Sequence, residues 1–267
     1  IRNGGTMSKI LNVILIAMLL MVAITACSKS PETARKELGQ MNIDYTEDNF
    51  IKYIERGDRV VVDLFLTAGM SPNLRGKDSG FYVLSTAASY GHDEIVKLLI
   101  AKGADVNRKN DGGLTALMFS LVKYPDVAKT LIKKGADVNA AITKGEGTGR
   151  TVLMMATQYI NKEIVEMLLD KGANVNAEVN DTQTKIPRTA LTDAIRRGDL
   201  EIIKVLLSKG AKVDAVNLAG SLKEVEILKT LLPHVKDKSD LDIALNVAKK
   251  FSHLEAVDIL KNAGAKE

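Results

Sequence analysis

The sequence predicts an all-α repeat protein, built as a stack of about seven helix–turn–helix units. One segment returns with small changes along the 267-residue chain. Its clearest copies are 94–107 (EIVKLLIAKGADVN), 126–139 (DVAKTLIKKGADVN), 163–176 (EIVEMLLDKGANVN) and 201–214 (EIIKVLLSKGAKVD), and a weaker copy lies at 59–73 (RVVVDLFLTAGMSPN). The near-constant spacing of these copies indicates stacked structural units rather than one globular core.

The repeated segment has the pattern of a short amphipathic helix with a glycine stop. Ile95, Leu98 and Leu99 fall at positions i, i+3 and i+4, so they form one apolar stripe. Gly103 follows the last turn, where glycine readily adopts the left-handed conformation that ends a helix. A helix this short is marginal alone in water, so its stripe must pack against a neighbouring copy.

The composition narrows the possible functions. Trp is absent and aromatic residues make up 4% of the chain, so aliphatic residues must build the core. The net charge is +4, and both signs are mixed throughout the chain. Nucleic-acid binding usually needs a concentrated basic face, so we expect no nucleic-acid partner.

Residues 7–26 have the features of a secretory signal peptide. Met7 is followed by Lys9 and by an apolar run from Ile10 to Ile24. A run of about 15 residues is short for a membrane-spanning helix, which needs about 20. Residues 1–6 fit no signal peptide. Since Gly4–Gly5 can be encoded by a ribosome-binding sequence, we expect residues 1–6 to be translated upstream sequence.

The end of this segment, Ile24 to Cys27 (ITAC), resembles the lipobox of bacterial lipoproteins. The resemblance implies that Cys27, the only cysteine, is lipidated and becomes the mature N-terminus. The protein would then sit at the cell membrane or the outer membrane, facing away from the cytoplasm. The alternatives are an uncleaved apolar anchor, or a cleaved signal with a stray thiol. Residues 27–43 would form the lipidated cysteine and a flexible tether, whose polar part of about 15 residues reaches roughly 20 Å.

The repeats follow in order over residues 44–267. Each should hold a first helix, a turn and a second helix. The units open near Asp44, Ser79, Asp111, Thr151, Thr189, Leu218 and Leu241. The sixth unit is degenerate, because Pro233 and His234 replace its Gly-Ala ending. Lysines keep the end of the last unit polar, as a terminal repeat requires.

These units resemble ankyrin repeats, in which about 33 residues form a β-turn and two helices. The spacings Gly69–Gly103 and Gly103–Gly135 match that length, and Gly-Ala-Asp-Val-Asn follows the helix at Gly103 and Gly135. The Thr-Pro-Leu-His motif of the family never occurs intact. The resemblance implies an ankyrin solenoid with β-turn fingers, whose concave face of finger tips and first helices binds proteins.

Two sets of residues are candidates for that binding. Aligned by repeat, the ends of the first helices give a row formed by Arg56, Tyr90, Lys123, Tyr159 and Arg197. Tyr and Arg are enriched at binding hot spots. The alternative is that these are ordinary solvated positions, with each Tyr shielding the turn below it. The second set lies in two overlong fingers and comprises Lys144, Glu146, Arg150, Asn180, Gln183 and Lys185.

The finger at 143–150 contains Gly145-x-Gly147-x-Gly149, which resembles a phosphate-binding loop. It lacks a preceding buried strand and a Gly-Lys-Ser/Thr ending, so a flexible finger explains it better. His92, His234 and His253 are scattered and have no metal-ligand spacing. We therefore expect no enzyme, no catalytic residues, no metal, no cofactor and no small-molecule substrate.

Together, these patterns predict a membrane-anchored, extracytoplasmic ankyrin-repeat lipoprotein that binds another protein. One form of this function is a general envelope scaffold. The alternative is an immunity or inhibitor protein that binds and blocks a toxin or secreted enzyme.

Overall fold

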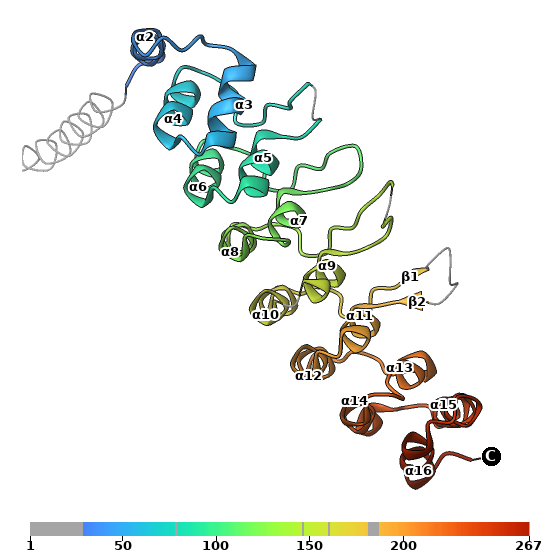
Figure 1. Cartoon of the computed structure of the whole chain (residues 1–267). Coiled ribbons are helices and arrows are strands. Elements are labelled where there is room, and N and C mark those ends of the chain that lie inside the picture. Colours follow the sequence, from blue (N-terminus) through green and yellow to red (C-terminus); the bar gives the residue numbers. More distant parts are fainter. Residues whose placement is uncertain (1–28, 78–79, 146, 160, 181–186, 267) are drawn as a thin grey trace, which may run out of the picture.

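The computed structural model describes residues 29–77, 80–145, 147–159, 161–180 and 187–266, which form an elongated stack of helix pairs (Figure 1). The predicted all-α solenoid is confirmed, with seven consecutive pairs from α3 to α16. The helices are α2 (Pro31–Gln40), α3 (Glu47–Arg56), α4 (Arg59–Thr67), α5 (Val83–Tyr90), α6 (Asp93–Ala101), α7 (Ala116–Ser120), α8 (Pro125–Lys133), α9 (Val152–Gln158), α10 (Lys162–Asp170), α11 (Ala190–Arg197), α12 (Leu200–Ser208), α13 (Ala215–Gly220), α14 (Val225–Leu231), α15 (Ser239–Lys250) and α16 (Leu254–Asn262).

The pairs form two layers. The first helices, α3 to α15 in alternation, stack on one another, and the second helices, α4 to α16, form the other layer (Figure 1). The fingers project from the layer of first helices. We call the surface made by the fingers and the first helices the finger side.

The predicted apolar stripe forms the core. Ile95 and Leu99 of α6 are 1% and 0% exposed, and the equivalent residues of α8, α10 and α12 are buried in the same way. Gly103 has φ +94°, so it ends the segment in the left-handed conformation. Each helix pair therefore buries its stripe only by stacking on its neighbours.

Asparagines link the first five repeats to one another on the exposed surface. The Asn107 side chain donates to the Gly135 carbonyl at 3.2 Å and accepts from the Asp137 amide at 2.7 Å. The same pair of bonds is made by Asn73, Asn139 and Asn176. Asp214 replaces the next asparagine and caps α13, accepting from the Asn217 amide at 2.9 Å. A carboxylate has no amide hydrogens to donate to a carbonyl. The asparagine ladder therefore ends where the sixth repeat begins.

The degenerate sixth repeat is formed. α13 and α14 pack together, and α14 continues into a 3₁₀ turn, Leu232–His234. A parallel bridge joins Val213 to Val235 in place of the missing Gly-Ala ending. The sequence therefore loses its repeat motif here without losing the helix pair.

The prediction of a flexible tether before the repeats is wrong for the described residues. Residues 31–40 form α2, which packs on α4 and buries Ala34 and Leu38 completely. Arg35 donates to the Ala68 carbonyl from Nη2 at 3.1 Å. Pro31 at the start of the helix and the Ser30 side chain, which accepts from the Thr33 amide at 3.1 Å, favour the helix. α2 therefore covers the N-terminal end of the core.

Candidate functional site

The first overlong finger is a hydrogen-bonded hairpin in its described residues. The Ile142 amide donates to the Arg150 carbonyl at 3.0 Å, and Ala141 forms a bridge with Thr151. A Cβ added at Gly147 would lie 3.1 Å from Arg150 Cδ, and Gly147 has φ +80°. The glycine pattern thus shapes the hairpin and lets the backbone approach Arg150. Lys144 is exposed, and Glu146 lies outside the described residues.

The second overlong finger follows it. Its strands β1 (Val179–Asn180) and β2 (Pro187–Arg188) pair antiparallel, with Val179 opposite Arg188. Asn180 is exposed, whereas Gln183 and Lys185 lie outside the described residues. A Cβ at Gly149 would lie 3.2 Å from Val179 Cγ2, so the two overlong fingers pack closely together.

Arginines gather where these fingers meet the first helices. Arg188 of β2 donates from Nε to Asp193 Oδ1 of α11 at 2.6 Å, and Arg196 reaches the same oxygen from Nη2 at 2.5 Å. Arg150 of the preceding finger donates from Nη2 to Gln158 Oε1 of α9. We call Arg150, Arg188 and Arg196 the arginine group.

The charges in this group interact. Partial burial is the main cause that lowers the pKa of the Arg150 guanidinium, and the positive charge of Arg188 lowers it further. The carboxylate of Asp193 acts in the opposite direction. The Asp193 side chain is only 1% exposed, so its ion pairs with Arg188 and Arg196 are the means by which the fold accommodates that buried charge.

Sequence reasoning identified Arg150 but missed Arg188, Asp193 and Arg196. A signal was present, because Asp193 aligns by repeat with Phe119 and Met155. An acidic residue at a position that is apolar in other copies predicts a buried charge with a basic partner.

The structure places the predicted row at, or within three residues after, the ends of successive first helices. Arg56, Tyr90, Lys123, Tyr159 and Arg197 are all exposed. Tyr90 is 48% exposed and stacks with His92, and Tyr159 is 40% exposed. The stacking of Tyr90 on His92 fits a shielding role as well as a binding role. The role of this row in protein binding therefore stays a prediction.

His92 has a structural position. Its Nε2 lies 2.9 Å from the Glu55 carbonyl oxygen, and its ring lies against Gly57 of the preceding turn. Among the described residues, no group of three or more His, Cys, Asp and Glu side chains is placed to hold a metal ion. In the same ranges, no helix combines the length and apolar character needed to cross a membrane.

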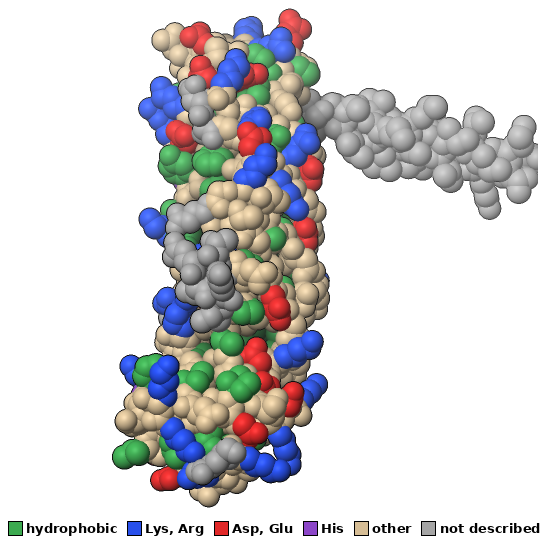
Figure 2. Space-filling view, turned by 90° about the vertical axis from the view of Figure 1, so that its right-hand side faces the viewer, with side chains coloured by type: hydrophobic (Ala, Val, Ile, Leu, Met, Phe, Trp, Pro, Cys, Tyr) green, Lys and Arg blue, Asp and Glu red, His purple; other side chains and the backbone are tan. Residues whose placement is uncertain are grey.

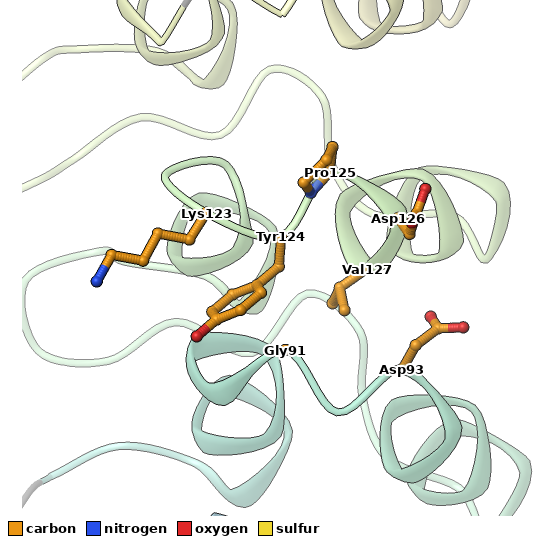
Figure 3. Close-up of a pocket in the computed structure, with 7 residues that line it drawn as sticks. All are labelled: Gly91, Asp93, Lys123, Tyr124, Pro125, Asp126 and Val127. Carbon is orange, nitrogen blue, oxygen red and sulfur yellow. The ribbon is translucent and has the colours of Figure 1, made fainter.

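A cavity of about 320 Å³ lies on the turn between α7 and α8 (Figure 3). Tyr124 and Pro125 stand there in place of the usual glycine turn, and the Tyr124 ring lies over Gly91 of the preceding repeat. Figure 3 shows Lys123 extending away from Asp93 and Asp126, which lie on the opposite side. The cavity is open to solvent and brings together no group of catalytic side chains among the described residues.

Comparison with known proteins identifies the class of this protein. The family profile described as ankyrin repeats (3 copies) matches residues 50–142 and 141–217. The chain belongs to the ankyrin-repeat family. Members of this family are in general interaction modules rather than enzymes, and ankyrin repeats bind proteins.

The relatives are similar to this chain over their ankyrin repeats and not over their whole length. An ankyrin repeat-containing protein of Treponema pallidum (strain Nichols) is 36% identical over 147 residues, 55% of this chain and 48% of that protein. The ankyrin repeat and KH domain-containing protein mask-1 of Caenorhabditis elegans is 33% identical, over 55% of this chain and 6% of that protein. The human ankyrin repeat and MYND domain-containing protein 1 is 43% identical over 68 residues, 25% of this chain and 7% of that protein. The chain thus matches about half, or much less, of each relative.

Proposed function

We propose that this protein is an extracytoplasmic lipoprotein, anchored to a bacterial membrane through Cys27, whose ankyrin array binds another protein on its finger side. The observation that supports binding is the stack of seven helix pairs, which presents fingers on one side (Figure 1) and exposed Tyr and Arg side chains at the ends of its first helices. Tyr and Arg supply much of the binding free energy at protein interfaces. The lipobox-like Ile24–Cys27 segment supports the anchor.

The position of α2 sharpens this proposal. Only Ser28, Lys29 and Ser30 separate Cys27 from the start of α2, and Lys29 is paired with Glu37 at 2.6 Å. A lipidated Cys27 would therefore hold the N-terminal repeat directly at the membrane surface, with no long tether. Binding partners within reach would be membrane proteins or proteins close to the envelope surface.

Replacement of the cysteine tests the anchor. We expect Cys27→Ser to release the protein from membranes and to abolish labelling by a radioactive fatty acid, because the thiol that carries the acyl chains is lost. Membrane fractionation and acyl labelling of the full chain measure both effects. Ser28→Ala is the matched control and should stay membrane-bound and labelled. Unchanged fractionation of Cys27→Ser would refute the anchor.

A double tyrosine variant tests the predicted row. We expect Tyr90→Ala with Tyr159→Ala to weaken binding of the partner recovered by crosslinking from native membranes by about tenfold or more. The melting curve should change little, because both side chains lie at the surface and are 48% and 40% exposed. Val60→Ala on α4, 65% exposed, is the control on the opposite layer and should bind normally. A large loss of stability in the double variant would instead make the tyrosines structural.

A further inference from the structure

The fingers differ in how their basic side chains are paired. Towards the N-terminal end, cations bind acids on the neighbouring repeat. Arg75 contacts Asp111 at 2.5 Å, and Lys109 contacts Asp137 at 3.8 Å. The finger side carries Lys and Arg side chains along its length (Figure 2). At the two overlong fingers, basic side chains outnumber the acidic side chains that pair with them among the described residues.

There, among the described residues, three guanidinium groups interact with a single carboxylate, two of them by direct contact. Asp193 pairs with Arg188 and Arg196, and Arg150 forms its hydrogen bond with the neutral Gln158. The positive charges of Arg188 and Arg196 both lower the pKa of Arg150, so these three groups lie close enough to repel one another. The arginine group thus has a local charge excess that a carboxylate would relieve.

Two polar atoms of the arginine group and its Asp193 partner have no hydrogen-bond partner in the described part of the chain. They are Arg150 Nε and Asp193 Oδ2, and both are buried. Arginine carries five donors in a planar fork that matches a carboxylate, so Arg150 retains donors that Gln158 does not use. Arg196 is 61% exposed, Arg150 is partly exposed, and Tyr159, whose charge acts on Arg150, is 40% exposed, so the group is accessible from the finger side.

From this arrangement we infer that the arginine group, with Tyr159, is the receptor for an acidic segment of a protein partner, whose Asp or Glu side chains approach from the finger side. The inference rests on the proposed protein-binding function and specifies the chemistry of its partner. Arg150 and Arg196 bind the incoming carboxylates. Arg188 stays with Asp193, because its side chain is 23% exposed and is therefore less accessible than that of Arg196, which is 61% exposed.

An acidic peptide tests the inference on the full chain purified in detergent. The probe is a fluorescein-labelled peptide of eight glutamates, and its binding is followed by fluorescence anisotropy at low salt. Arg150→Gln with Arg196→Gln should weaken binding by about tenfold or more, because two charge-assisted contacts are lost. The matched control, Arg59→Gln with Lys133→Gln on the second helices, removes the same charge and should bind within about twofold of the parent. Thermal unfolding checks that each variant is folded.

Asp193→Asn gives a result of opposite sign. It removes the competing internal carboxylate, so a folded Asp193→Asn protein should bind the glutamate peptide several-fold more tightly. Equal losses in the test and control pairs, or weaker binding by folded Asp193→Asn, would overturn the inference. Equal binding of an eight-nucleotide single-stranded DNA with the same arginine dependence would also overturn the assignment to a carboxylate. These results test the chemistry of the site alone. The proposed protein-binding function is tested separately, by recovery of a partner through crosslinking.

Discussion

Replacing Phe65 with Ala is expected to lower the free energy of unfolding by about 3–5 kcal/mol. Phe65 of α4 is fully buried and lies at the centre of the aromatic cluster of the first repeat. Its ring centroid is 5.5 Å from that of Phe50, 5.7 Å from that of Tyr45 and 6.5 Å from that of Tyr53. Truncation would leave a cavity that helices held by their neighbours on both sides fill only in part.

Urea unfolding followed by circular dichroism measures this loss. Phe251→Ala is the matched control, because Phe251 is 62% exposed at the turn between α15 and α16. That substitution should change stability by about 0.5 kcal/mol or less. Similar losses in the two variants would contradict the packing described for the first repeat.

The second large effect is expected from Leu38→Asp in α2. Leu38 is fully buried against α4, so a carboxylate there would lose its hydration. Because burying an unpaired charge is costly, α2 should detach from α4 instead. The loss of stability is then limited to the free energy of docking α2, about 2–3 kcal/mol if it is dominated by burial of one leucine.

Amide hydrogen exchange measures this detachment directly. Exchange over residues 31–40 should accelerate in Leu38→Asp, while exchange in α6 to α12 stays close to that of the parent. Gln40→Asp adds the same charge at an exposed position of α2 and should leave the helix docked. Protection of α2 in Leu38→Asp equal to that in the parent would show that Leu38 does not hold the helix in place.

The sequence could predict those parts of the fold that depend on residues close together in the chain. The stripe at Ile95, Leu98 and Leu99 and the stop at Gly103 predicted the helices and their period, because both depend on neighbouring residues in the chain. The asparagine ladder was not predicted. Asn107 hydrogen-bonds residues 28 and 30 positions away, so its role depends on how adjacent repeats are stacked.

The helix α2 was missed for a different reason. Ser30 before Pro31 and Glu32 is a standard helix start, and Ala34 and Leu38 lie one turn apart on one face. The polar composition of this segment nevertheless favoured a tether. Ten residues form a stable helix only when docked, and the α4 surface that receives α2 is not visible in the local sequence.

The candidate site was predicted only in part for the same reason. Arg150 could be selected because its finger is longer than the repeat requires. Its relation to Arg188 and Arg196 depends on the packing of two fingers and α11, which residue spacing does not specify. Asp193 was detectable in principle, as the acidic member of an otherwise apolar or small column in the first helices.

The central claim is that this chain binds a protein through its finger side. Amide hydrogen exchange of the full chain, with and without the partner recovered by crosslinking from native membranes, tests it most directly. We predict slower exchange on binding in the fingers at 141–151 and 179–180 and at the ends of α9 and α11. Slower exchange confined to the second helices, α4 to α16, would contradict the claim.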